Sequence, residues 1–239
     1  AQADHPYIQN LPALIPGHQL PQEVLPGAVS ILVYYIPFTR ELARTNQGKG
    51  ELASAQWART YEETNAMFRD LNEQLSAWLG EKGVRAAVPE ASCTFDQKAL
   101  MSGWSHRHFA WAAGLGTFGM NNMLITRQGC CGRFFSLVTD LEVETDAPVQ
   151  GEYCLYKQDQ SCGVCMEYCP AQALSPQGYD RQSCYKILQK NAQVHTEYGS
   201  SYVSADKVTP NSPGSDVCGK CVANAPCAFR GFGPERKRE

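Results

Sequence analysis

The stretch Cys162-Gly163-Val164-Cys165-Met166-Glu167-Tyr168-Cys169-Pro170 decides how this chain is built. Its three cysteines follow the spacing C-x2-C-x3-C-P. In iron-sulfur proteins a loop of this kind supplies several thiolates to one cluster, and the cysteine before the proline reaches a second cluster. The wider stretch from Cys154 to Cys227 holds eight of the eleven cysteines. The sequence therefore predicts an iron-sulfur protein that carries electrons.

The eight cysteines can serve two [4Fe-4S] clusters if the fourth ligands cross over, as they do in two-cluster ferredoxins. A second cysteine group, Cys218-x2-Cys221-x5-Cys227, follows the quoted loop along the chain. The expected ligands of the first cluster are Cys154, Cys162, Cys165 and Cys227. The expected ligands of the second cluster are Cys169, Cys184, Cys218 and Cys221.

Zinc is the competing metal, because two C-x2-C pairs can form one tetrahedral site of four thiolates. Such a site would leave the other four cysteines of the stretch without a role. Disulfides fit less well, because an odd number of cysteines in C-x2-C pairs is typical of metal thiolates in a reducing compartment. Cys93, Cys130 and Cys131 lie outside the stretch, and we expect them to be buried or idle thiols.

The composition is that of an ordinary folded protein. With 239 residues, 43% hydrophobic and 19% charged, the chain can form one large domain or two modest ones. A net charge of -3 gives no electrostatic case for general nucleic-acid binding. Apolar runs are shorter than the ~20 residues of a membrane span, and residues 1–21 lack a signal-peptide pattern. We expect a cytoplasmic protein outside the membrane.

The first part of the chain predicts a mixed α/β domain. Five prolines in residues 1–28 exclude a long helix and predict an extended arm. Residues 28–36 are almost continuously apolar and predict a strand buried on both faces. Large apolar residues recur at helical spacing over 53–80, which predicts a long amphipathic helix capped by Ser54. Further predicted elements are a helix over 105–113 and strands over 84–88, 123–126 and 134–139.

Regular periodicity gives way to cysteines after Asp140, so we place a domain boundary near residue 150. The predicted domains are an α/β cofactor-binding domain over 1–150 and an iron-sulfur domain over 151–239. In the second domain we expect a helix over 180–194 that carries Cys184, and a loop over 198–216.

Residues 114–119 contain the pattern G-x-G-x-x-G, which occurs in dinucleotide-binding proteins. That motif requires a strand before the glycines and a helix after them. Here a helix-like segment comes before them and a strand-like segment after them, so dinucleotide binding is disfavoured. The glycines either allow a tight helix-to-strand connection or line a cofactor pocket. The sequence leaves both alternatives open.

The segment from His108 to Thr126, HFAWAAGLGTFGMNNMLIT, resembles the A-G-L-G-x-x-G-x-N-x-L-L-I segment of epoxyqueuosine reductases. The iron-sulfur part of reductive dehalogenases carries a similar segment. In both families a double-cluster module follows, with a lone cysteine at the position of Cys184. The resemblance extends from about Gly27 to the end of the chain.

This resemblance implies an α+β protein, in which a nitroreductase-like α/β domain that binds cobalamin precedes a ferredoxin-like two-cluster domain. The nearer cluster would reduce the cobalt, which would carry out the chemistry. The residues that the resemblance places at the corrinoid are Gly114, Leu115, Gly116, Gly119 and Asn121.

The expected proton donor is where the chain departs from these families. Epoxyqueuosine reductases have an aspartate shortly before the A-G-L-G sequence, and dehalogenases use a tyrosine. Between residues 91 and 113 this chain has no tyrosine and a single carboxylate, Asp96, which comes several residues too early. His106 and His108 could donate protons near neutral pH. The candidate acids are therefore Asp96, His106 and His108.

The resemblance predicts a reductase that passes electrons through two clusters to cobalamin, which then reduces a small-molecule or corrinoid substrate. Reduced ferredoxin or flavodoxin would be the electron donor. The alternative is an electron-transfer protein or reductive activator that reduces a partner corrinoid or flavin protein and has no substrate of its own. Because the chain ends soon after Cys227, we expect that tRNA is not the substrate.

Overall fold

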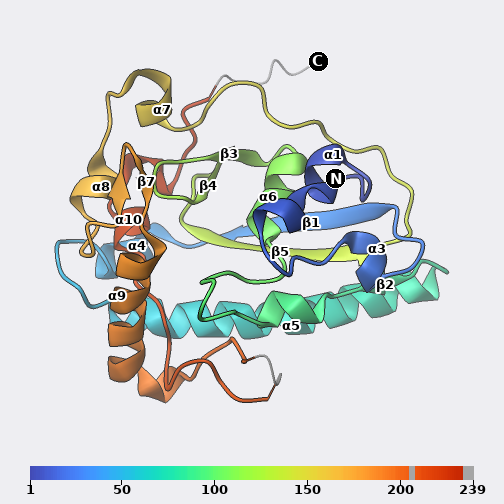
Figure 1. Cartoon of the computed structure of the whole chain (residues 1–239), viewed down its shortest axis with the longest axis horizontal. Coiled ribbons are helices and arrows are strands. Elements are labelled where there is room, and N and C mark those ends of the chain that lie inside the picture. The colour runs from blue at the N-terminus through green and yellow to red at the C-terminus, as the bar shows by residue number, and fades with distance from the viewer. Residues whose placement is uncertain (205–207, 234–239) are drawn as a thin grey trace.

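An antiparallel three-stranded sheet forms the centre of the molecule in the computed structural model, which describes residues 1–204 and 208–233. The strand order is β1-β5-β2, with β1 at Ser30–Pro37, β5 at Gly132–Thr139 and β2 at Ala86–Ala87. β1 pairs with β5 along its whole length, from Ser30 opposite Thr139 to Pro37 opposite Gly132. Helix α5, at Ala55–Glu81, covers one face of the sheet, and helix α6, at His106–Ala112, covers the other (Figure 1). The predicted mixture of helix and sheet is confirmed.

Helix α5, at Ala55–Glu81, is the long amphipathic helix that the sequence predicted. The Ser54 hydroxyl oxygen accepts a hydrogen bond from the Trp57 backbone N–H at 3.1 Å, which confirms the predicted N-cap. On the buried side of the helix, the Phe68 ring stacks on Phe135 of β5 with 5.0 Å between centroids. The Tyr34 hydroxyl of β1 donates to Asn72 Oδ1 at 2.9 Å. These contacts fix the helix against the sheet.

The prediction of an extended N-terminal arm is wrong. This segment contains three short helices, α1 at Pro6–Gln9, α2 at Leu11–Leu14 and α3 at Pro21–Val24, each with a proline in its first two positions. Proline lacks an N–H, but the first turn of a helix does not need that donor, so proline starts these helices instead of preventing them. Ile8 and Leu11 are fully buried beside Trp104.

Helix α6, at His106–Ala112, leads into a hairpin of β3, Gly116–Phe118, and β4, Leu124–Thr126. The sequence predicted α6 and β4 but missed β3. The strand predicted over 84–88 is present only as the two residues of β2, which pair with the end of β5. Helix α4, at Arg40–Thr45, follows β1 and begins at a Thr39 N-cap.

Short elements form the cysteine-rich end of the molecule, beyond one end of the sheet (Figure 1). The predicted helix over 180–194 is confirmed as α9, at Arg181–Val194, with Asp180 as its N-cap. Residues 199–204 and 208–216 form the expected loop. The remaining elements are α7 at Leu155–Asp159, α8 at Val164–Glu167, the β6–β7 hairpin at Leu174–Ser175 and Gly178–Tyr179, α10 at Lys220–Ala223, and single 3-10 turns at Glu90–Cys93, Thr196–Tyr198 and Pro226–Ala228.

Buried packing continues across the predicted boundary at residue 150. One core cluster joins Trp57 and Ile125 from the first part of the chain to Tyr153 and Val222 from the second. Residues 140–150 form a strand-free connection that crosses from the end of β5 back toward the cysteine-rich end (Figure 1). The division into two domains stays a prediction.

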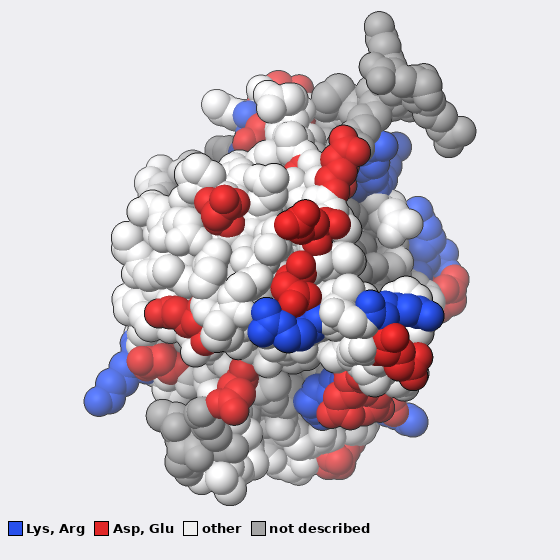
Figure 2. Space-filling view, turned by 90° about the vertical axis from the view of Figure 1, so that its right-hand side faces the viewer, with Lys and Arg blue, Asp and Glu red and all other residues white. Residues whose placement is uncertain are grey.

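The described residues contain no helix that is both long enough and apolar enough to cross a membrane. Figure 2 shows the end of the molecule that lies away from the cysteine-rich elements. Acidic and basic side chains are interspersed on this face, and they form no continuous basic area there.

Candidate iron-sulfur centres and the adjoining cavity

The eight cysteines of the predicted clusters lie around two separate cavities. A small cavity of about 20 Å³ has in its wall Cys154, Cys162, Cys165 and Cys227. A larger cavity of about 500 Å³ has in its wall Cys169, Cys184, Cys218 and Cys221. These are the two groups that the crossed ligand pattern predicted. The assignment of each cysteine as an iron ligand stays a prediction.

Short helices and tight turns present these cysteines. Cys154 caps α7, Cys165 lies within α8, and Cys221 lies within α10. The Cys169 sulfur, just after α8, accepts a hydrogen bond from the Ala173 backbone N–H at 3.3 Å. Cys184 lies on the first turn of α9. Each group therefore combines sulfurs from sequence segments that are far apart.

In each group, neighbouring cysteines raise the pKa of a buried thiol. Burial raises the pKa of Cys165 to about 12, with further contributions from Cys227, Cys154 and Cys162. Burial also raises the pKa of Cys218 to about 11, and Cys184 and Cys169 add to that rise. Four crowded thiols are costly to ionise without a cation, whereas thiolate is the form that binds metal. This donor set fits a group that carries several metal ions.

Among the residues that the structure describes, no three His, Cys, Asp or Glu side chains are placed to bind one metal ion together. In a [4Fe-4S] cluster, each of the four cysteines instead binds a different iron at the corner of a cube. The fit to two clusters therefore rests on how the sulfurs surround the two cavities.

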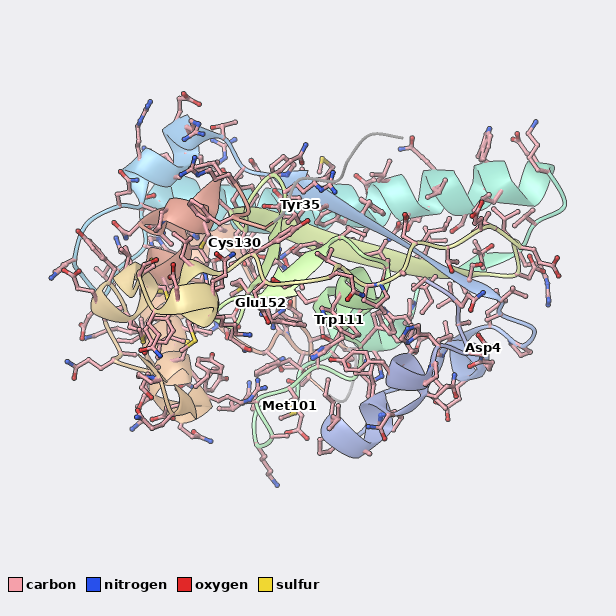
Figure 3. All side chains as sticks on the ribbon, turned by 90° about the horizontal axis from the view of Figure 1, so that it is seen from above. Asp4, Tyr35, Met101, Trp111, Cys130 and Glu152 are labelled. Atoms are coloured by element: carbon pink, nitrogen blue, oxygen red, sulfur yellow. The ribbon has the colours of Figure 1, made fainter. Side chains whose placement is uncertain are left out.

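Asn121 and Cys130 lie where the two cavities approach each other. Asn121 is 3% exposed and lies in the walls of both cavities. Its side-chain amide donates to the Cys130 sulfur at 3.5 Å and to the Cys221 carbonyl at 3.5 Å. The Cys130 sulfur is 3.9 Å from the Cys227 sulfur. Figure 3 shows Cys130 at the end of the sheet that faces the cysteine-rich elements.

The sequence correctly predicted a buried Cys130 but missed its place beside a predicted cluster ligand. The turn before β5 brings it there: the backbone N–H groups of Cys130 and Cys131 donate to the carbonyls of Cys227 at 3.0 Å and Ala228 at 2.9 Å. Cys130 and Cys227 are 97 positions apart in sequence, so no local pattern could have signalled the contact.

The larger cavity has the volume of a small-molecule site. Helix α6 contributes His106, Arg107 and His108 to its wall, and β5 contributes Arg133. Asp216, two residues before Cys218, also lines it. Several aromatic side chains complete the wall: Trp57, Tyr61, Phe95, Trp104, Phe134, Tyr179, Tyr185 and Tyr202. The second cysteine group and the candidate histidines thus share one cavity.

Both cavity histidines are neutral at pH 7. Burial, together with smaller contributions from the nearby Arg133 and Arg107, lowers the pKa of His106 to about 3. Burial lowers the pKa of His108 to about 4, again with help from Arg107. A neutral imidazole can donate or accept a hydrogen bond, but it lacks the additional proton of an imidazolium acid.

A hydrogen-bond chain favours the neutral form of His106 that carries its proton on Nε2. The Trp104 indole N–H donates to the Ser136 hydroxyl oxygen at 3.0 Å. The Ser136 hydroxyl lies 2.8 Å from His106 Nδ1 and has its own proton to donate. With Nδ1 as the acceptor, Nε2 of the neutral ring carries the proton. His108 Nδ1 lies 2.6 Å from the Ser105 hydroxyl.

Asp96, the third candidate acid, lies apart from both cavities. Its side chain is exposed and accepts hydrogen bonds from the backbone N–H groups of Lys98 at 2.7 Å and Ala99 at 3.0 Å. These bonds lower its pKa, because they stabilise the carboxylate. The side chain acts as a turn cap in this structure. The histidines and Asp96 are therefore not brought together.

Sequence reasoning also missed Asp216. Burial, together with a smaller contribution from the charge of Glu62, raises the pKa of Asp216 to about 7. Its Oδ1 atom is buried without a hydrogen-bond partner among the described residues. A carboxyl group close to Cys218 in sequence had no motif of its own, so only the folded structure places it at the cavity.

The glycine segment, residues 114–119, does not line the larger cavity, where the resemblance implied that it contacts a corrinoid. Of Gly114, Leu115, Gly116, Gly119 and Asn121, Asn121 alone lies in the wall of the larger cavity. A Cβ atom on Gly114 would overlap the Ala147 carbonyl, and one on Gly116 would overlap the Ile125 carbonyl. The glycines therefore allow close backbone approach, which is the tight connection that the sequence left open as one alternative.

Known proteins were compared with the chain by family, sequence and structure. No family model matches it. An epoxyqueuosine reductase from Leadbetterella byssophila is 30% identical over 133 residues, which cover 54% of this chain and 38% of that protein. An epoxyqueuosine reductase from Synechocystis sp. is 27% identical over 216 residues, which cover 85% of this chain and 65% of that protein.

Solved structures of epoxyqueuosine reductases have a similar fold. The one from Streptococcus thermophilus matches with a TM-score of 0.57 at 15% identity, over 100% of this chain and 63% of that chain. An epoxyqueuosine reductase with an epoxyqueuosine-modified tRNA-Tyr stem loop matches with a TM-score of 0.56 at 20% identity, over 94% of this chain and 57% of that chain.

The latter structure corrects our expectation about tRNA. The sequence predicts that tRNA is not the substrate, yet an epoxyqueuosine reductase with a similar fold is solved with a tRNA stem loop. The chain spans about half the length of the curated relatives it matches. In sequence and fold, this chain is similar to epoxyqueuosine reductases, as the resemblance predicted.

Proposed function

We propose that this chain is an iron-sulfur oxidoreductase in which two [4Fe-4S] clusters deliver electrons to a group bound in the larger cavity. One observation carries this proposal: the eight cysteines divide into two groups of four around two cavities, and the second group shares its cavity with His106, Arg107 and His108. A group in that cavity would lie next to the second cluster. Electrons would enter at the first cluster and pass Asn121 on the way to the second cluster.

The finer architecture that we propose is a nitroreductase-like α/β domain over 1–150 followed by a ferredoxin-like domain over 151–239. Reduced ferredoxin or flavodoxin is the proposed electron donor. For the redox group in the cavity we propose cobalamin, which when bound supplies a strongly reducing metal centre. Asn121, Asn122 and Arg107 would contact it, because they line the cavity. The glycines of the segment 114–119 would support that wall from behind.

The protein groups of the cavity would bind and orient the substrate. His106, with its proton on Nε2, would donate a hydrogen bond to an acceptor atom, and the aromatic side chains would exclude water from the reacting atoms. The substrate class is open between small molecules, corrinoids and a modified tRNA stem loop. A tRNA stem loop is included among the candidate substrates because an epoxyqueuosine reductase with a similar fold is solved with one.

Anaerobic purification followed by iron, sulfide and zinc analysis tests the two-cluster proposal. We expect about eight irons and eight sulfides per chain, with about four of each remaining in Cys184→Ala. Cys93→Ala is the matched control, because Cys93 lies in neither cavity wall, and it should retain eight irons. A colourless protein that contains zinc and no labile sulfide would overturn the proposal.

A spectrophotometric titration of the reduced protein with cob(II)alamin tests the cofactor. Binding should change the corrinoid absorbance in a saturable way. A protein with eight irons that binds no corrinoid would refute the cobalamin part. If that protein also reduced a corrinoid or flavin protein rapidly without turning over any substrate, it would be the electron-transfer alternative.

A further inference from the structure

Two arginines of the larger cavity, Arg107 and Arg133, form no ion pair with any residue that the structure describes. Arg133 donates from Nη2 to Asn65 Oδ1 at 2.8 Å, and its guanidinium lies 4.0 Å from the centroid of the Tyr61 ring. Its Nε is buried and has no hydrogen-bond partner among the described residues. Arg107 donates from Nη1 to the Asn122 carbonyl at 2.5 Å and lies 3.3 Å from Met123 Sδ. All these partners are neutral.

The two guanidinium groups also act on each other. The charge of Arg133 lowers the pKa of Arg107, after the larger effect of burial. Both arginines contribute to the lowered pKa of His106, so the positive potential extends across this wall of the cavity. The described ion pairs all involve other residues. Of the described residues in the cavity wall, Asp216 is the only acid; it forms no described ion pair with either arginine, and the charge of Arg133 lowers its pKa only as a minor effect after burial and Glu62 raise it.

A buried charge without a counter-charge is costly. Tyr61 and Asn65 offset part of that cost for Arg133, because an aromatic face and an amide oxygen both attract a guanidinium. They do not supply negative charge. An anionic group from a ligand would, and the planar guanidinium fork is suited to the two oxygens of a carboxylate or a phosphate.

We propose that the larger cavity binds its ligand through an oxyanion, a carboxylate or a phosphate, held by Arg133 of β5 and Arg107 of α6. This inference deepens the proposed function. It rests on that function for one point, that the larger cavity is the site of reduction. The oxyanion anchors the ligand at the arginine side of the cavity. The rest of the ligand extends along the aromatic wall toward Cys169, Cys184, Cys218 and Cys221.

The test is calorimetric titration of the anaerobically purified full chain with three probes: inorganic phosphate, pyrophosphate and benzoate. Arg133→Met keeps the length of the side chain and removes its charge. The matched control is Arg69→Met, since Arg69 is exposed on α5 and is absent from the cavity wall. We expect Arg133→Met to weaken binding roughly ten- to a hundredfold, the loss expected for a charge-assisted hydrogen bond, and Arg69→Met to leave it unchanged.

The probes separate the two kinds of oxyanion, because stronger binding of benzoate indicates a carboxylate and stronger binding of pyrophosphate indicates a phosphate. Iron content is measured on each sample, so a cluster-free protein that still binds through Arg133 would refute the proposed function and leave this inference standing. If Arg133→Met loses its clusters, Arg107→Met on α6 makes the same comparison. Equal affinity in the wild type and the arginine variants, or no binding of any probe to a protein with eight irons, would overturn the inference.

Discussion

Replacing Gly129 by alanine should remove one iron-sulfur cluster and leave the other. Gly129 lies in the turn before β5, with a φ of +92°, and a Cβ atom there would overlap the carbonyl of Ala228 and the N atom of Phe229. These are backbone atoms, so no side-chain rotation can relieve the overlap. The neighbouring segment contains Cys227, a predicted ligand of the first cluster.

The free-energy cost of the Gly129→Ala substitution has two parts. Alanine at positive φ costs ~1 kcal/mol relative to glycine. Relief of the overlap would separate the turn from the cysteine loop and break the hydrogen bonds from the Cys130 and Cys131 N–H groups to residues 227 and 228. Two such bonds contribute about 1–3 kcal/mol together. In a chain of this size, that second part alone corresponds to roughly 2–12 °C in the midpoint of thermal unfolding.

Gly199→Ala is the matched control, because Gly199 has a φ of +68° and open space where its Cβ would be. It carries the strain of positive φ without the overlap. Iron analysis, electron paramagnetic resonance of the reduced protein and a thermal unfolding scan are run on both variants. Gly129→Ala should retain about four irons and unfold below Gly199→Ala. Eight irons and equal midpoints in the two variants would refute the docking of this turn on the cysteine loop.

Three further outcomes are expected. Gly219→Ala should lose the second cluster instead, because a Cβ atom there would overlap the Trp57 ring beside Cys218. If Gly219→Ala and Gly129→Ala lost the same electron paramagnetic resonance signal, the assignment of the two cysteine groups would be contradicted. Cys130→Ala should keep eight irons but lower the midpoint potential of the first cluster in a redox titration, because it removes an S–H donor 3.9 Å from the Cys227 sulfur, whereas loss of iron would make Cys130 a ligand. The folded-state pKa of His106, about 3, lies below its unfolded value, so the unfolded chain takes up the proton first as the pH falls. The free energy of unfolding should therefore decrease below about pH 6.5, by about 1.4 kcal/mol per pH unit. Between pH 7 and pH 5, the thermal midpoint of His106→Gln should decrease less than that of the wild type, and equal decreases would count against a buried neutral His106.

The parts of the fold that local periodicity determines could be predicted from the sequence. α5 and α9 have apolar residues at helical spacing and polar N-caps, and their predicted positions agree with the structure to within about two residues. Strand β3 was missed because it begins at Gly116 within the glycine segment, and glycine is depleted in strands, whereas β4 has the same length but an apolar start. The N-terminal helices were missed because proline is compatible with both an extended arm and the first turn of a helix.

The candidate site could likewise be predicted from the sequence only in part. Cysteine spacing was enough to predict two groups of four, because cluster ligands come partly from one tight loop and the remaining ligands follow by count. The cavity residues Arg133 and Asp216 could not be predicted, since they come from β5 and from the loop after α9 and meet only in the folded chain. Asp96 was a candidate by its position in sequence, and its backbone hydrogen bonds keep it on the surface.

The glycine segment that carries the family resemblance has a structural explanation that does not require direct contact with a cofactor. Gly116 allows β3 to approach the Ile125 carbonyl of β4, and a Cβ atom on Gly119 would lie 2.8 Å from the side-chain oxygen of Asn121. The hairpin is therefore closed tightly around its tip, where Asn121 is buried and lines both cavities. Larger residues in place of the glycines would displace that amide from the Cys130 sulfur and the Cys221 carbonyl. The segment thus fixes a polar bridge between the two predicted clusters, and the cofactor wall that the resemblance implied would be its indirect result.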